Sequence, residues 1–173
     1  METDWPGADA RAMTFDQFHP GQRLTYGPAG ISEAEILAFA NAYDPQWFHA
    51  DVERARAGRW HGLIASGWHT CAIAMRLVVD GALRESESFG SPGLEYLKWL
   101  APVRPGDALT VHAEVLDVRR SERNPTLGVL RWRWQLVNQG GAAVLELVAT
   151  SLFDLAPAST DDARTSSVTR VAQ

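Results

Sequence analysis

Cysteine is nearly absent from this sequence, which contains only Cys71 among its 173 residues. A single thiol excludes an internal disulfide and any metal centre that needs several thiolates, and it suits a reducing cytosol. No apolar run approaches the roughly 20 residues that span a membrane. Residues 1–11 carry acids where a signal peptide has a basic stretch followed by an apolar one. We therefore expect a soluble, cytoplasmic protein.

Basic residues are also in short supply, with 16 Lys and Arg against 21 Asp and Glu and a net charge of −5. Because positive charge is not clustered, we expect no nucleic acid partner. Hydrophobic residues make up 46% of the sequence, enough for one domain with a real core. We place that domain at residues 22–155, between an amino-terminal extension at 1–21 and a polar carboxyl-terminal tail at 156–173.

A capping box predicts where the first long helix begins. Ser32 and Glu35 have the spacing of that motif, so the helix should begin at Glu33. Pro45 disfavours helical geometry at the preceding residue, so the helix should end with Asp44 at its exit. The inner face of this helix is expected to consist of four residues, Ile36, Phe39, Ala40 and Tyr43.

Two further helices are indicated downstream. A short one can begin after Asp51 and stop at Gly58. Residues 66–79 are apolar on almost every side, which predicts a helix that is buried all round and has no face towards solvent. Gly81 is placed to stop this helix.

From about residue 92 the hydrophobic period changes from that of a helix to that of a strand. Apolar residues alternate with other residues over 109–115 and 130–136, and runs at 94–100 and 142–153 complete the set. The connections are too short for crossover helices, so neighbouring strands should be antiparallel. The pattern predicts an α+β fold in which an antiparallel sheet wraps around the long apolar helix.

The stretch "AYDPQWFH", residues 42–49, places Asp44 five positions before His49. One interpretation is structural, with a turn that ends the helix and an imidazole satisfied by a backbone carbonyl. The other is catalytic. Trp47 and Phe48 bring apolar bulk, and burial would raise the carboxyl pKa towards neutrality, where a general acid or base is useful. A nearby imidazole could then hold a shared water.

The stretch "HGLIASGWHT", residues 61–70, places Gly67 at the start of the apolar helix. Backbone N–H groups at a helix start have no intrahelical acceptor and can stabilise an oxyanion. Alternatively, Ser66 caps the helix and Gly67 only permits close packing. Both interpretations are open from these residues.

Together these stretches resemble the signature of the MaoC-like acyl dehydratases, also called the hydratase 2 or (R)-specific enoyl-CoA hydratase group. "YDPQWFHAD" resembles the element with Asp and His, "GLIASGWHT" the glycine-led helix start, and "GLEYLKWLAPVRPGD" the strand and turn that follow. The resemblance covers residues 21–153. The commonest signature reads Gly-Asp-x-Asn-Pro-x-His, and this chain has Tyr43, Gln46 and Trp47 in place of the Gly, Asn and Pro.

The resemblance implies a hot-dog fold and a homodimer or higher homo-oligomer whose sheets join edge to edge. It implies reversible addition of water across the 2,3 double bond of an acyl-CoA thioester. In that reaction Asp44 and His49 would orient the water, and the Gly67 amide would polarise the thioester carbonyl. Substrate binding is expected from Gln46, Ser66 and Trp68. No metal is implied, and no cofactor besides the coenzyme A of the substrate.

Two other functions remain open for the same fold. A hot-dog acyl-CoA thioesterase also uses a carboxylate near a helix amino terminus, and a non-catalytic acyl-CoA-binding subunit would keep the fold without activity. The Asp and His spacing before a glycine-led helix favours the hydratase. Retention of both Asp44 and His49 argues against a subunit that has lost activity.

Several conspicuous residues are interpreted as structural. The "RWRW" of residues 131–134 alternates as a half-buried strand does, although its arginines could meet the phosphates of coenzyme A. His61 and His69, taken with His49, do not have the spacing of a metal site. Cys71 lies in the middle of its predicted helix among Ala and Ile. We expect it to be a residue of the hydrophobic core and not a nucleophile.

Overall fold

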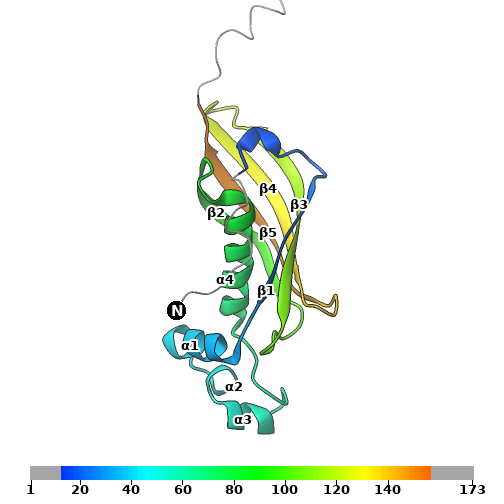
Figure 1. Cartoon of the computed structure of the whole chain (residues 1–173). Coiled ribbons are helices and arrows are strands. Elements are labelled where there is room, and N and C mark those ends of the chain that lie inside the picture. Colours follow the sequence, from blue (N-terminus) through cyan, green and yellow to red (C-terminus); the bar gives the residue numbers. More distant parts are fainter. Residues whose placement is uncertain (1–12, 157–173) are drawn as a thin grey trace, which may run out of the picture.

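The structure of the chain is a computed structural model that describes residues 13–156. Residues 1–12 and 157–173 lie outside the described part, and nearly all of the predicted tail at 156–173 falls there. The helices are α1 (Glu33–Tyr43), α2 (Trp47–Ala50), α3 (Val52–Ala57) and α4 (Gly67–Val78). Figure 1 shows a curved sheet around α4, with α1, α2 and α3 gathered at one end of the molecule.

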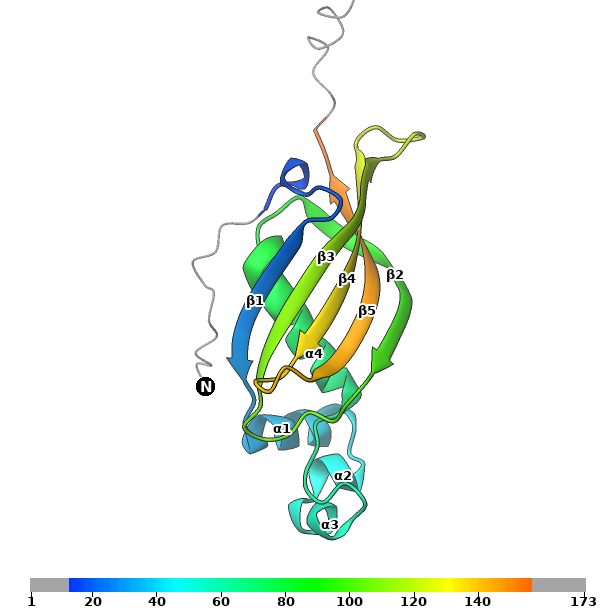
Figure 2. The ribbon, with the colours of Figure 1, turned by 90° about the vertical axis from the view of Figure 1, so that its right-hand side faces the viewer.

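The sheet has five strands in the order β1-β3-β4-β5-β2, and every neighbouring pair is antiparallel. Its strands are β1 (Arg23–Gly30), β2 (Ser88–Trp99), β3 (Ala108–Arg120), β4 (Leu127–Val137) and β5 (Ala143–Asp154). Figure 2 shows the strands side by side, with α4 behind them. The predicted α+β hot-dog fold, an antiparallel sheet around a long central helix, is confirmed.

The first strand, β1, was not predicted from the sequence. Its hydrophobic alternation is broken at Gly27 and Pro28, where the pairing with β3 shifts register between Tyr26 and Ala29. A Cβ at Gly27 would lie 2.8 Å from the carbonyl oxygen of Leu109, so glycine allows the two strands to approach closely at this bulge.

The inner face of the sheet forms the core as the alternation predicts. Its buried side chains include Leu109, Val111, Ala113 and Val115 on β3, and Leu130, Trp132, Trp134 and Leu136 on β4. Phe15 and Phe18, on and beside the short helix η1 (Phe15–Gln17), pack on the same core, with ring centroids 5.7 Å apart for Phe18 and Trp132. The core therefore includes residues before position 22, where the predicted domain boundary lies.

The long helix α4 matches the prediction in position, but the prediction that it has no face towards solvent is wrong. Trp68 is 62% exposed and Met75 is 44% exposed, because the sheet covers one side of the helix only. The prediction of Gly81 as the stop is also wrong. The chain continues as a π-helical turn, η2 (Val79–Leu83), in which the missing side chain of Gly81 makes room for the ring of Tyr26.

The capping box predicted at the start of α1 is confirmed, because the Ser32 hydroxyl accepts the Glu35 N–H at 3.2 Å. Asp44 follows the last residue of the helix, as expected. The predicted inner position of Tyr43 is wrong, since this side chain is 76% exposed, with its ring tilted against that of Phe39. The short helix after Asp51 is confirmed as α3, while α2 was not predicted.

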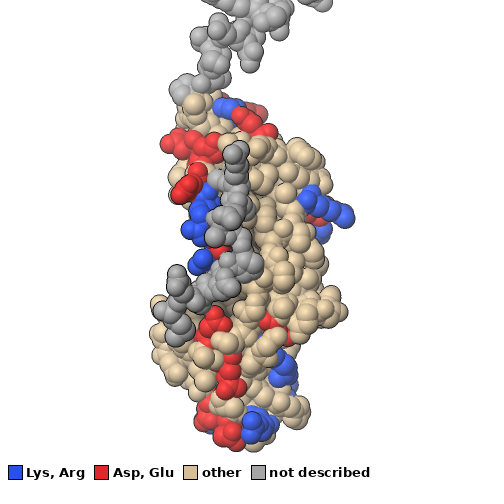
Figure 3. Space-filling view, in the orientation of Figure 1, with Lys and Arg blue, Asp and Glu red and all other residues tan. Residues whose placement is uncertain are grey.

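Charge is distributed unevenly over the surface. On the face shown in Figure 3, acidic side chains lie in groups at both ends of the molecule, and basic ones lie between these groups and also at the end that carries α1–α3. Between residues 13 and 156, no helix is long and apolar enough to cross a membrane.

Gly81→Ala should lower the free energy of unfolding by about 1–3 kcal/mol, as overpacking does. The reason is steric, because a Cβ at position 81 would lie 2.0 Å from Cδ1 of Tyr26. Gly90→Ala is the matched control, since a Cβ there would meet no atom within 4 Å. Urea denaturation measures both variants, and equal stabilities for the two would contradict the close contact at Gly81.

Candidate active site

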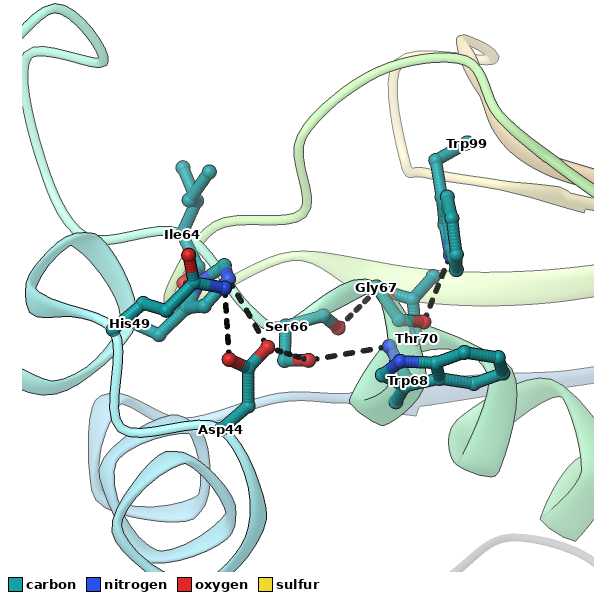
Figure 4. Close-up of polar contacts among 9 residues, drawn as sticks. Asp44, His49, Ile64, Ser66, Gly67, Trp68, Thr70 and Trp99 are labelled. Atoms are coloured by element: carbon teal, nitrogen blue, oxygen red, sulfur yellow. Dashed lines mark hydrogen bonds and ion pairs between the residues drawn. The ribbon is translucent and has the colours of Figure 1, made fainter.

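Three helix ends meet at one point beside the sheet. Asp44 lies at the carboxyl-terminal end of α1, His49 lies in α2, and Ser66 precedes α4 (Figure 4). The segment between α3 and α4 is held by backbone hydrogen bonds, because Ile64 N–H donates to Phe48 at 3.3 Å and Ala65 N–H donates to Val103 at 2.8 Å. The chain thus brings together residues that are 22 positions apart.

The Asp44 carboxylate accepts two side-chain hydrogen bonds. The Ser66 hydroxyl donates to Oδ2 at 2.7 Å, and the Gln46 amide donates to Oδ1 at 2.9 Å. The hydrogen bond from Ser66 does most to lower the pKa of Asp44 below its ordinary value, with help from Gln46 and His49 and against partial burial. Burial does act to raise this pKa, but the hydrogen bonds outweigh it, so the expectation of a pKa near neutrality is wrong and Asp44 is ionised at neutral pH.

The His49 imidazole is buried and has a defined tautomer. Its Nδ1 lies 2.7 Å from the carbonyl oxygen of Ile64, which can only accept, so Nδ1 carries a proton. Its Nε2 lies 3.5 Å from Oδ2 of Asp44. In the neutral ring Nε2 is an acceptor. With the ring neutral, two acceptors face one another, and a water that sits beside the pair could donate one hydrogen to each.

The start of α4 combines a cap with a close contact. The Ser66 hydroxyl accepts the Trp68 N–H at 3.2 Å while it donates to Asp44, so the predicted cap is confirmed. A Cβ at Gly67 would lie 2.5 Å from Cε2 of Trp99, so the packing interpretation of this glycine is also confirmed. The Gly67 N–H belongs to the first turn, where N–H groups have no intrahelical acceptor.

A pocket of about 460 Å³ lies at this junction. Its walls include the predicted catalytic residues Asp44, His49 and Gly67 and the predicted binding residues Gln46 and Trp68. Ser66 was predicted to bind substrate, but it is buried and lies behind Asp44. Trp99 and Val103, which also line the pocket, were not predicted as site residues, because they come from the end of β2 and the connection after it, which only the fold brings here.

A second pocket of about 360 Å³ lies on the outer face of the sheet, and polar side chains in its lining are paired with one another. Thr25 hydrogen-bonds His112 at 3.1 Å, and Arg133 is paired with Glu114. Arg131 is likewise paired with an acid on β2, so the strand interpretation of "RWRW" is confirmed. We therefore place the candidate site in the first pocket, at the amino-terminal end of α4.

The remaining residues considered from the sequence do not join the site. Cys71 is half-buried, and burial raises the pKa of its thiol, which makes it a poor nucleophile. His69 stacks on Phe39 with ring centroids 4.5 Å apart, and burial lowers the pKa of His69. Within the described residues, no group of three or more His, Cys, Asp or Glu could hold a metal ion.

Known proteins share this architecture. The family described as a MaoC-like domain matches residues 16–130. The uncharacterized protein YdeM of Bacillus subtilis is 34% identical over 134 residues, which are 78% of this chain and 94% of YdeM. The 3-hydroxyacyl-thioester dehydratase Z of Mycobacterium tuberculosis is 32% identical over 90 residues, 51% of this chain and 60% of that protein. The solved structure of a MaoC-like dehydratase from Rhodospirillum rubrum is similar with a TM-score of 0.75 and 37% identity, over 82% of this chain and 97% of that one.

Ser66→Ala should raise the pKa of Asp44 and lower the free energy of unfolding by about 0.5–2 kcal/mol, since the carboxylate loses a donor and α4 loses its cap. A lowered pKa contributes stability above the ordinary value of 3.8, and this contribution is lost as the pH falls through the pKa of the folded state. The difference in free energy of unfolding between the parent and the variant should therefore become smaller as the pH is lowered. Carboxyl-carbon NMR titration and urea unfolding measure the two effects.

Ser32→Ala is the matched control, because Ser32 caps α1 in the same way. It should lose a similar amount of stability and leave the titration of Asp44 unchanged. An unchanged Asp44 pKa in Ser66→Ala would contradict the role given to this hydroxyl.

Proposed function

We propose that this chain, which belongs to the MaoC-like domain family, is a hydro-lyase that adds water reversibly across the 2,3 double bond of an acyl-CoA thioester. One observation carries the proposal. The Asp44 carboxylate and His49 Nε2 lie 3.5 Å apart and face the same pocket as the start of α4. The names of two similar proteins, a MaoC-like dehydratase and a 3-hydroxyacyl-thioester dehydratase, support the reaction class.

The first step in the proposed reaction is the positioning of water. Asp44 Oδ2 and His49 Nε2 each accept one hydrogen of the same molecule, so the lone pairs of the water oxygen are directed away from both. Those lone pairs can then attack C3 of an enoyl thioester. Because both acceptors are held by other hydrogen bonds, the water is oriented before the substrate arrives.

The second step is the movement of charge and protons. As the water oxygen bonds to C3, the electron pair of the double bond moves towards the thioester oxygen, and the Gly67 N–H stabilises this enolate. The Asp44 and His49 pair takes one proton from the water and a proton is returned to C2, so the product gains one molecule of water. Nothing is oxidised or reduced, and the proposed chemistry uses no metal or further cofactor.

A thioesterase is the second candidate, because Asp44 lies beside the amino-terminal end of α4, where a carboxylate could direct water at the thioester carbon instead. An enoyl thioester loses its absorbance on hydration and releases a free thiol on hydrolysis. A non-catalytic subunit would bind acyl-CoA and do neither.

The cytoplasmic location stays a prediction that rests on the cysteine content of the sequence.

We further propose that the protein is a homodimer. In the described sheet β2 pairs only with β5, so its other edge is open, and such edges are usually covered. Large apolar side chains are exposed on α4 and along this strand, among them Met75, Phe89 and Leu94. A second copy that pairs along the same edge would remove both features from water.

Asp44→Asn and His49→Gln should each lower kcat by about a hundred- to ten-thousandfold, the range typical of general acid and base groups. The loss of absorbance of crotonyl-CoA measures the rate, and circular dichroism checks the fold. Asp51→Asn is the control, because Asp51 caps α3 and an asparagine can do the same. Parent-like hydration by either site variant would remove the residue from the proposed mechanism.

Leu94→Glu should shift the protein towards a monomer, since it places a charge on the exposed apolar edge strand. Sedimentation of the parent should report twice the chain mass of 19.0 kDa. Ala57→Glu adds the same charge to an exposed position on α3 and should stay dimeric. A parent that sediments as a monomer at micromolar concentration would contradict the dimer.

A further inference from the structure

Trp99, the last residue of β2, forms the wall of the pocket on the far side of Gly67 from Asp44 and His49 (Figure 4). Its indole Nε1–H donates to the Gly67 carbonyl oxygen at 2.9 Å. Trp68 packs against it edge-on, with ring centroids 5.5 Å apart and planes at 83°. These contacts hold the Trp99 ring in one position across the first turn of α4.

The pocket has a buried end and an open end. Ile64 is 6% exposed and lies with His49 and the buried Val103 at one end. In the single chain, Trp99 is 49% exposed and Leu100 is 50% exposed at the other end. A ligand whose polar part stays in water can therefore extend past Trp99, while the part that reaches His49 lies deepest.

The chemistry of an enoyl thioester gives the order of its atoms along this path, if the proposed function holds. C3, C2, C1 and sulfur follow one another, and conjugation keeps C1 to C3 in one plane. With C3 at the water held by Asp44 and His49, and the carbonyl oxygen at the Gly67 N–H, the sulfur points past Gly67. We propose that the indole of Trp99 is a substrate-binding surface for the thiol arm that follows the sulfur, and not for the acyl chain.

The physical match is between a flat, half-exposed aromatic face and the first part of a pantetheine arm, which consists of methylene groups and amides. Aromatic faces bury much area at little cost in conformational entropy, and this ring is already immobilised. The arm has the same structure in coenzyme A and in the prosthetic group of acyl carrier proteins. Trp99 therefore recognises a part of the substrate that does not vary with the acyl group.

The test compares three crotonyl thioesters that share the reacting atoms and differ in the arm, namely those of coenzyme A, pantetheine and ethanethiol. In Trp99→Ala, kcat/KM for the first two should fall about ten- to a hundredfold, as expected for loss of one buried aromatic contact. The ethanethiol ester has no arm, so its kcat/KM should fall by a much smaller factor, which reports only the lost contact between Trp99 and Gly67. Trp99→Phe retains an aromatic face without the indole N–H. The ratio of kcat/KM for the thioesters with the arm to kcat/KM for the ethanethiol ester should therefore stay close to the parent ratio.

Binding gives a readout that does not depend on hydration. The thioether S-butyl-pantetheine cannot react, and calorimetry should show that the parent binds it about tenfold or more tightly than Trp99→Ala does. If the parent binds the thioether and hydrates no thioester, the proposed function fails while the role of Trp99 stands. Equal losses on all three thioesters, equal thioether affinities, or no thioether binding by the parent would each overturn that role.

Discussion

The Ser66 hydroxyl joins the start of α4 to the carboxylate at the exit of α1. It accepts the Trp68 N–H at 3.2 Å and donates to Asp44 at 2.7 Å, so one oxygen atom both caps a helix and fixes the position and charge of an acid. Because the donor stabilises the carboxylate, the pKa of Asp44 is lowered although the group is partly buried. A helix cap and a candidate base therefore depend on the same hydroxyl group.

The rest of the site is arranged around this link by backbone groups. The carbonyl of Ile64 binds the Nδ1–H of His49, and the neighbouring Ala65 is anchored to Val103, in the connection between β2 and β3. The imidazole can therefore turn only its Nε2 towards Asp44. The sheet also positions the site, because β2 places Trp99 in contact with Gly67 at the start of α4.

Local signals in the sequence predicted what local physics determines. The capping box placed the start of α1, Pro45 placed its end, and strict alternation placed β3 and β4. The strand β1 was not predicted because its alternation is interrupted at a bulge. The exposed side of α4 was not predicted because it depends on how far the sheet curves around the helix, and residue spacing does not determine that curvature. The direction of the Asp44 pKa shift was misjudged for the same reason, since the donor that decides it lies 22 residues away.

The proposed role of the site concerns where one water molecule is delivered, and isotope labelling follows that molecule directly. Crotonyl-CoA would be incubated with the protein in water enriched in oxygen-18, and the products would be identified by mass spectrometry. The account predicts 3-hydroxybutyryl-CoA with one heavy oxygen at C3 and an intact thioester. Free crotonate with the heavy oxygen in its carboxyl group would show that the water is directed at C1, and would contradict the account.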